Sequence, residues 1–158
     1  SEFVKMCKDA GVISIINDRA DIAIASGADG VHLGQNDLPI EQARKLQIRP
    51  MIFGKSTHSL TQINTAIAEL PTYVSLGPVF ATPTKPDTKP VGIDYVKEAL
   101  PILTDTGVGH VAIGGITESN IEAVFAAGAR TIAISSAVTN SPDPTAACKK
   151  LKQIITSF

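Results

Sequence analysis

The sequence predicts an α/β fold, a (β/α)8 TIM barrel that lacks its first two βα units. Short apolar runs rich in valine and isoleucine alternate with helical patterns along the chain. Strict alternation of this kind produces a parallel sheet. Glycine or polar residues follow nearly every apolar run, and six such runs are recognisable.

Each predicted strand is too short for a helix and is apolar along most of its length. This is the composition expected of a strand that is covered on both faces. The predicted strands are Val12–Ile16, Gly30–Leu33, Met51–Gly54, Tyr73–Leu76, His110–Ile113 and Thr131–Ile134.

Helical patterns separate the strands, and several carry the usual start and stop residues. Thr117 and Asp143 stand at N-cap positions, and Gly27 and Gly128 stand at C-cap positions. The predicted helices are Ala20–Ser26, Pro39–Leu46, Leu60–Glu69, Tyr95–Leu103, Glu118–Ala127 and Pro144–Ile155.

The residues after the strands favour a closed barrel over an open, doubly wound sheet. A barrel places chemistry at the C-terminal end of every strand, whereas an open sheet concentrates it at one switch point. The strand ends here are Asn17-Asp18, Gly34-Gln35, Lys55-Ser56, Gly77, Gly114-Gly115 and Ser135-Ser136.

The beginning of the chain indicates an incomplete barrel. Ser1–Ala10 has the pattern of the second half of a helix that leads into Val12. Six strands cannot close an eight-stranded barrel. We therefore expect two βα units to be missing upstream, and we interpret residues 1–158 as a single domain that forms the C-terminal three-quarters of a TIM barrel.

The composition argues against several classes of protein. The net charge is −1, only 4% of residues are aromatic and no basic run is present, which disfavours nucleic-acid binding. No stretch has the length and apolarity of a membrane span, and no secretory signal opens the chain. Cys7 and Cys148 are interpreted as ordinary thiols in a reducing compartment. We expect a cytoplasmic protein that acts on small molecules, and the sequence leaves homo-oligomer formation open.

Asp18 and Asp37 each follow a predicted strand, one βα unit apart. Neighbouring parallel strands lie only about 4.8 Å apart, so the two carboxylates could converge on one cation. Mg²⁺ prefers one or two carboxylates together with phosphate oxygens and water. Either aspartate could instead cap the helix that follows it, at Ala20 or at Pro39.

Two further segments carry groups suited to a phosphorylated ligand. Ser56 and His58 follow the third strand and could hold phosphate or pyrimidine, although Ser56 or Thr57 could also cap the next helix. The range from Thr82 to Lys85 lies in a long, proline-rich loop between Pro78 and Val91. Its hydroxyls and ammonium suit phosphate, although a solvated loop with an incidental lysine would look the same.

The last two strands end in small residues that suit an anion. Gly114-Gly115 lets the backbone approach a ligand closely, and Ser135-Ser136 follows the next strand. The loops after the final two strands of such barrels commonly bind phosphate. Among the histidines, His32 and His110 are interpreted as structural, and His58 is the one candidate for a functional role.

These motifs together resemble those of the thiamine-phosphate synthase (thiamine-phosphate pyrophosphorylase) family. The resemblance spans nearly the whole chain, in order and at plausible spacing. The matching motifs are I-N-D-R at Ile16–Arg19, G-V-H-L-G-Q-N-D at Gly30–Asp37, G-K-S-T-H at Gly54–His58, L-G-P-V-F-A-T-P-T-K at Leu76–Lys85, A-I-G-G-I at Ala112–Ile116 and I-S-S-A at Ile134–Ala137.

The resemblance implies a role for each candidate residue and no catalytic acid or base. Asp18 and Asp37 correspond to Mg²⁺ ligands. Contacts to the pyrimidine diphosphate correspond to Asn17, Ser56 and Lys85. Contacts to the thiazole phosphate correspond to Thr82, Pro83, Thr84, Gly115, Ser135 and Ser136. The family's basic strand end, of the type Gln-Leu-Arg-x-Lys, has no counterpart in this sequence.

The implied reaction is a transfer in which a thiazole nitrogen displaces pyrophosphate from the pyrimidine methylene carbon. The product is thiamine phosphate, and a carbocation-like intermediate is plausible because the aminopyrimidine can stabilise positive charge. Two alternatives remain open. One is an isomerase of the thiazole tautomerase type on the same fold. The other is an inactive remnant that binds a phosphorylated ligand, because the basic strand end is absent.

Overall fold

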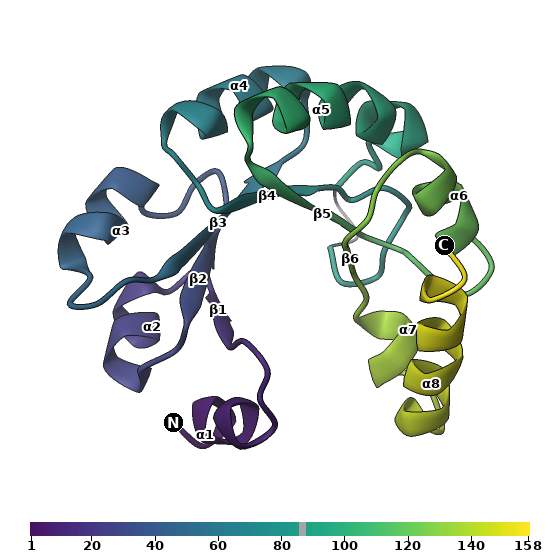
Figure 1. Cartoon of the computed structure of the whole chain (residues 1–158), viewed down its shortest axis with the longest axis horizontal. Coiled ribbons are helices and arrows are strands. Elements are labelled where there is room, and N and C mark those ends of the chain that lie inside the picture. The colour runs from purple at the N-terminus through teal and green to yellow at the C-terminus, as the bar shows by residue number, and fades with distance from the viewer. Residues whose placement is uncertain (86–87) are drawn as a thin grey trace.

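A computed structural model describes residues 1–85 and 88–158 of the chain. Its parallel sheet contains six strands in the order β1-β2-β3-β4-β5-β6, so each strand pairs with its sequence neighbours. Figure 1 shows the sheet curved into an arc, with helices α2 to α6 along its outer side. The molecule is therefore a half-barrel with two edge strands, β1 and β6. The predicted α/β class and strand order are confirmed, and closure by two further βα units remains a prediction.

The strands lie close to their predicted positions. Two of them, β2 and β4, have the predicted bounds, whereas β3 continues past Gly54 and β6 is reduced to two residues. The strands are β1 (Ile15–Asn17), β2 (Gly30–Leu33), β3 (Ile52–Thr57), β4 (Tyr73–Leu76), β5 (Gly109–Ile113) and β6 (Ile132–Ala133).

The first strand begins later than its apolar run predicts. Val12 and Ile13 are exposed and belong to the connection after the first helix. Ser14 is buried, and both its backbone N–H and its hydroxyl donate to the Asp29 carboxylate, at 2.8 and 2.7 Å. This link to the loop before β2 holds the entry to β1, so regular pairing begins only at Ile15.

The helices differ from the predicted set in a few places. The helix after the long loop is three residues longer at each end than the predicted Tyr95–Leu103, α6 begins later than predicted, and a one-turn helix that was not predicted follows β6. The helices are α1 (Glu2–Asp9), α2 (Ala20–Ser26), α3 (Ile40–Leu46), α4 (Leu60–Ala68), α5 (Gly92–Thr106), α6 (Ile121–Ala126), α7 (Ser136–Thr139) and α8 (Pro144–Ile155).

The predicted helix ends are partly confirmed. Asp143 caps α8 by accepting from the Ala146 N–H at 2.9 Å, and Gly27 ends α2 in the left-handed conformation. Thr117 is not the N-cap of α6, because α6 begins at Ile121 after Asn120. The Asn120 side chain accepts from the Thr117 N–H, which forms a separate turn ahead of the helix. Gly128 lies one residue beyond the C-cap, at φ 101°.

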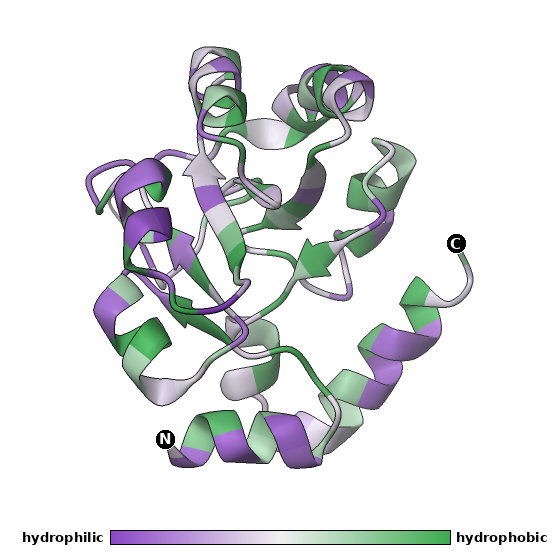
Figure 2. Cartoon of the chain, turned by 60° about the vertical axis from the view of Figure 1, so that its left-hand side comes forward, coloured by the Kyte–Doolittle hydropathy of each residue, from purple (hydrophilic) through white to green (hydrophobic). Residues whose placement is uncertain are grey.

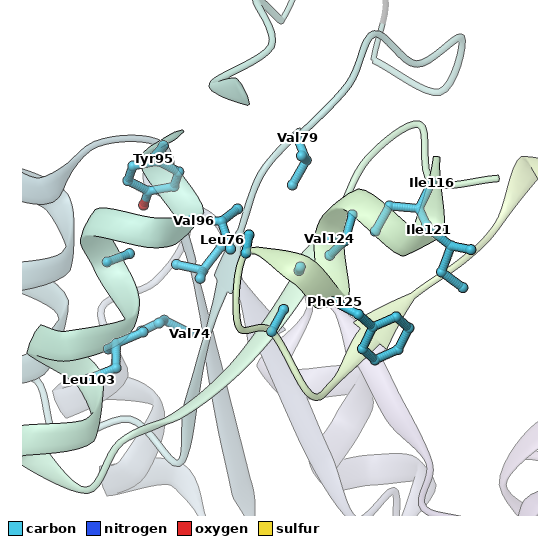
Figure 3. Packing of buried hydrophobic residues seen from close by; sticks show 14 of the residues in the cluster. Val74, Leu76, Val79, Tyr95, Val96, Leu103, Ile116, Ile121, Val124 and Phe125 are labelled. Carbon is cyan, nitrogen blue, oxygen red and sulfur yellow. The ribbon is translucent and has the colours of Figure 1, made fainter. Parts of the chain in front are cut away.

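The core lies between the outward face of the sheet and the helices. Figure 3 shows Val74 and Leu76 of β4 beside Val96 of α5, with Val124 of α6 on the other side. A second cluster joins β2 and β3 to α2 and α3 through Val31 and its neighbours. Helices such as α8 carry both hydrophilic and hydrophobic residues (Figure 2), as expected of helices with one packed face. In the part of the chain that the structure describes, none of the helices is long and apolar enough to span a membrane.

A buried lysine joins the sheet to this helical layer. Lys55 of β3 is 5% exposed, and its ammonium lies 3.6 Å from Oε1 of Glu69, at the end of α4. The other oxygen of Glu69 accepts the Ile40 N–H at the start of α3, at 2.9 Å. One carboxylate therefore balances a buried cation and satisfies a free N–H of a helix.

We predict that Glu69→Gln lowers the free energy of unfolding by about 1–3 kcal/mol, because buried Lys55 loses its anionic partner. The amide oxygen can still accept from Ile40. Urea denaturation checks this prediction, with Glu41→Gln in the exposed Glu41–Lys45 pair as the matched control. The double variant Lys55→Met/Glu69→Gln removes the cation as well and should recover most of the loss. A double variant no more stable than Glu69→Gln contradicts the assignment.

Candidate active site

A cavity of about 330 Å³ opens at the C-terminal ends of the strands. It receives residues from the end of every strand and from the loop after β4. Most of the residues that the sequence singles out as ligand contacts line it. These are Asn17, Ser56, Thr82, Thr84, Lys85, Gly115, Ser135 and Ser136.

Three predicted site residues do not line the cavity. Pro83 is exposed between Thr82 and Thr84, both of which do line it. Asp18 follows the lining residue Asn17, and Asp37 lies in the loop after β2. The two aspartates are therefore at the rim of the cavity, beside its wall.

The carboxyl groups of Asp18 and Asp37 adjoin one another. Partial desolvation and then the neighbouring Asp37 carboxyl raise the pKa of Asp18, whereas the Lys85 ammonium and the Asn17 side chain lower it. Like charges held this close disfavour ionisation, and a cation between them would relieve that repulsion. Three of the predicted residues, Asp18, Asp37 and Lys85, are therefore close enough to act on one another electrostatically.

Neither aspartate acts as the helix cap that the sequence left open. The N-cap of α2 is Arg19, which makes no capping side-chain bond, and Asp18 adopts a left-handed conformation with φ 64°. Asp37 accepts from the Gly34 N–H at 2.6 Å, which closes a turn before α3. Ser56 is not a cap either, because Ser59 caps α4. None of these three residues therefore caps the helix that follows it.

The adjoining carboxylates fit a magnesium ion by their chemistry. Mg²⁺ takes hard oxygen ligands, commonly one or two carboxylates, and completes its shell with substrate phosphates and water. In the described ranges, 1–85 and 88–158, no group of three or more His, Cys, Asp or Glu side chains is placed to hold a metal ion. The protein therefore offers two carboxylate ligands and would leave the remaining positions to water and substrate.

The glycine pair at the end of β5 has a clear packing role. Gly114 and Gly115 have φ of 100° and 62°, and a Cβ at either would overlap Pro78 or the backbone at Phe80 and Ala81. The loop after β4 crosses here, with the Phe80 N–H donating to the Gly114 carbonyl at 3.0 Å. Both glycines line the cavity, so close passage of the loop and access for a ligand are needed at the same place.

Two histidines contribute to the wall. His58 lines the cavity, and its Nδ1 lies against the Gly77 carbonyl oxygen. His32, predicted as a core or wall residue, also lines the cavity and is hydrogen-bonded through both ring nitrogens to hydroxyl groups. Burial, followed by the nearby Lys85 ammonium, lowers the pKa of His32 to about 4. The ring is therefore neutral near pH 7.

Sequence reasoning missed several lining residues. Ser75 stands inside an apolar strand, where nothing in the pattern separates it from its neighbours. The apolar residues of the wall carry no chemical signal of their own; they are Pro78, Ile113, Ile116 and Ala133. Only the alternation of sides along a strand could have indicated Ser75, once the direction of Tyr73 was known.

We predict that His32 makes the protein less stable in acid. Its folded pKa of about 4 lies below the usual histidine pKa of 6.5, so between these values the unfolded chain binds the proton and stability falls as pH falls. The full effect is at most about 3 kcal/mol. Urea denaturation across this window should show wild type losing more stability than His32→Asn. Parallel curves for the two proteins contradict this prediction.

Comparisons with known proteins show the family of the chain. A family profile described as thiamine monophosphate synthase (TMP-TENI) matches residues 1–138. A thiamine-phosphate synthase from Prochlorococcus marinus is 45% identical over 154 residues, which cover 98% of this chain and 43% of that protein. One from Methanoregula boonei is 43% identical over 157 residues, covering 99% of this chain and 71% of that protein. The chain thus spans less than half the length of the Prochlorococcus marinus protein.

Solved structures support the same relationship. The thiamine phosphate pyrophosphorylase from Pyrococcus furiosus superposes with a TM-score of 0.86 at 31% identity, covering 97% of this chain and 72% of that chain. A 3-hexulose-6-phosphate synthase superposes with a TM-score of 0.69 at 21% identity, which shows a shared fold alone. By sequence and by structure, the chain belongs to the thiamine monophosphate synthase family.

Proposed function

We propose that this half-barrel carries most of the substrate site of a thiamine-phosphate synthase. The enzyme would join 4-amino-2-methyl-5-(diphosphooxymethyl)pyrimidine to 4-methyl-5-(2-phosphoethyl)thiazole, or to its carboxylated form, and release pyrophosphate. One observation carries the proposal. A single cavity has paired carboxylates and Lys85 at one part of its rim and the glycine and serine ends of β5 and β6 at another. Such a site suits two substrates that each carry phosphate.

The metal would be Mg²⁺, held by Asp18 and Asp37. The proposal rests on their adjoining carboxyls and on the nearby Lys85. When bound, the ion would neutralise charge on the diphosphate and favour its departure. Lys85 would add a fixed positive charge on the same group.

The remaining residues would divide between the two substrates. Asn17 and Ser56 stand with Lys85 on the side of the carboxylates, so we assign them to the pyrimidine diphosphate. The segment from Thr82 to Thr84, which includes Pro83, would contact the thiazole phosphate. The ends of β5 and β6 would contact the same phosphate through Gly115, Ser135 and Ser136, whose backbone and hydroxyl groups suit an anion.

The chemistry needs positioning more than proton transfer. The bond between the methylene carbon and the diphosphate oxygen breaks, and a bond from the thiazole nitrogen to that carbon forms. The cavity would hold both substrates in line, and fixed charges at its rim would stabilise the leaving diphosphate. Neutral His32 is unsuited to act as a cationic acid here, which agrees with a site that has no general acid.

The active form would be a closed barrel, completed by two βα units between the free edges of β1 and β6. The proposal is supported by six strands in order and by the curvature of the sheet (Figure 1). The resemblance implies a strand with basic residues for the diphosphate, which has no counterpart in residues 1–158. Full activity would therefore require a chain extended before Ser1 by two βα units of a full-length family member.

We predict that the extended chain releases pyrophosphate only when both substrates and Mg²⁺ are present, and that Asp37→Ala abolishes this release. Removing one of two carboxylates should weaken the metal, so added Mg²⁺ should restore part of the activity of the variant. Asp94→Ala is the matched control, because Asp94 is an exposed helix residue whose ion pair among the described residues is with Lys97. A phosphate-release assay coupled to pyrophosphatase measures the rate.

Other outcomes of that assay would overturn the proposal. Metal-independent conversion of the thiazole alone would indicate an isomerase. No turnover, with thiazole phosphate still bound, would indicate a protein that binds the ligand without reaction.

We also predict that Lys85→Ala weakens binding of the pyrimidine diphosphate about tenfold or more, because a charge-assisted contact to phosphate is lost. The affinity for thiazole phosphate should change far less. Calorimetry with each substrate separately measures both constants, and Lys89→Ala in the same loop is the control. Equal losses for the two substrates contradict the assignment of Lys85.

A further inference from the structure

Three residues form a row across the inner face of the sheet. His32 of β2 pairs in register with Gly54 of β3, and Gly54 pairs with Tyr73 of β4. A Cβ at Gly54 would overlap both the His32 ring and the Tyr73 ring. Because glycine stands between them, the two rings meet across β3, with centroids 5.5 Å apart and planes at 26°. This glycine therefore makes room for a specific contact.

The histidine ring connects the hydroxyl of Tyr73, which lies outside the cavity lining, to serine hydroxyls that line the cavity. Its Nδ1 lies 3.0 Å from the Tyr73 hydroxyl, and its Nε2 lies 2.9 Å from Oγ of Ser56. Ser75 Oγ is farther from the same nitrogen, at 3.4 Å. Ser56 follows Gly54 by two residues on β3, so its side chain is on the same face. His32 and Ser56 line the cavity, and Tyr73 does not.

The direction of these hydrogen bonds follows from the tyrosine. Burial raises the pKa of Tyr73, so its hydroxyl keeps its proton. Within residues 1–85 and 88–158, His32 Nδ1 is the one hydrogen-bond partner of that hydroxyl. A phenol is a stronger hydrogen-bond donor than acceptor, so this contact favours donation from Tyr73 to Nδ1. The neutral ring carries one proton, which this arrangement places on Nε2.

We infer that His32 is a positioning residue that orients Ser56 as a hydrogen-bond donor to the ligand. The Nε2–H donates to Ser56 Oγ and occupies its acceptor side, so the serine proton is directed to another acceptor. A ligand bound in the cavity would supply that acceptor. The inference rests on the proposed function, in which Ser56 contacts the pyrimidine diphosphate, a molecule with ring nitrogens and phosphate oxygens that accept. The relay from Tyr73 through His32 would thus select for an acceptor at this point.

The opposite tautomer would reverse the relay. With the proton on Nδ1, that nitrogen would donate to Tyr73, and Nε2 would accept from Ser56 or Ser75. Ser56 would then present a lone pair to the cavity and select for a donor, such as the amino group of the pyrimidine. The two states differ only in proton placement, so the tautomer of one ring decides what Ser56 recognises.

The first test needs no ligand and measures the tautomer directly. Nitrogen-15 NMR of the histidine-labelled chain near pH 7 should show the His32 proton on Nε2. Tyr73→Phe removes the donor to Nδ1 and should reduce that preference. A proton on Nδ1 in the wild type overturns the inference, whatever the enzyme assay shows.

The second test compares two replacements that keep different halves of the ring. Asparagine at position 32 keeps a polar group near Nδ1 but cannot reach Ser56, whereas glutamine places its amide N–H₂ near Nε2. His32→Asn should weaken binding of the pyrimidine diphosphate roughly tenfold, the loss of one well-made hydrogen bond to a polar ligand. His32→Gln should restore most of that affinity. Calorimetry with Mg²⁺ present measures both, with thiazole phosphate as the ligand whose affinity should not change.

A double-variant cycle separates positioning from a general structural effect. In the Ser56→Ala background, His32→Asn should have no further effect on the affinity for the pyrimidine diphosphate, because the relay has already lost its end. Equal losses in both backgrounds, or no rescue by glutamine, overturn the inference. These binding measurements use the extended chain. If that chain with His32 and Ser56 intact does not bind the diphosphate at all, the proposed function fails, and the NMR result still decides the tautomer.

Discussion

Parallel, in-register pairing of neighbouring strands is the constraint on which the whole site depends. Each strand of the half-barrel pairs with its neighbours in sequence, and all point the same way. The residue after each strand therefore arrives at one rim, although the residues concerned are spread from Asn17 to Ser136. No long-range ion pair or disulfide is needed to bring them together. The core on the outer side, between β4, α5 and α6, holds the sheet in the curvature that makes the rim concave (Figure 3).

The inner face of the sheet differs from the outer face in the residues that it presents. Outward residues are valine, leucine and phenylalanine packed beneath helices, together with the Lys55–Glu69 pair. Inward residues near the rim include hydroxyls, one imidazole and several glycines, beside apolar residues such as Ile113 and Ala133. The glycines leave room for bulky neighbours: Gly54 for the His32 and Tyr73 rings, and Gly114 for Pro78. The wall therefore combines a few fixed polar groups with close packing, which is what a preorganised binding site requires.

Most of the fold could be predicted from the sequence because each strand is a short apolar run with a marked end. The runs at Gly30–Leu33 and Tyr73–Leu76 coincide with β2 and β4. Failures occurred where local pattern and tertiary contact disagree. A helix was predicted from Glu118 with Thr117 as its cap, yet the Asn120 side chain accepts from the Thr117 N–H and α6 begins only at Ile121. Val12 and Ile13 read as strand, but the Ser14–Asp29 contact places them in a connection.

The residues of the site also divide into those that the sequence indicates and those that only the structure reveals. Residues at strand ends, such as Asp18 and Ser135, could be predicted because position after a strand is visible in one sequence. The His32–Tyr73 contact could not, since it depends on register across β3 and on an absent side chain at Gly54. Likewise, the length and proline content of the loop between Pro78 and Val91 are visible in the sequence, but its crossing over Gly114 depends on the tertiary structure. Residues 86–87 of that loop lie outside the described part of the chain.

The backbone conformation at Asp18 sets the stability of the protein against the carboxylate that this residue supplies. A non-glycine residue at φ 64° costs folding free energy, of the order of 1 kcal/mol, that glycine would not. Substitution to glycine would therefore be favoured if thermostability alone were selected. Asp18→Gly would also remove a carboxylate from the rim, so a change made for heat resistance at this position would weaken the proposed metal site.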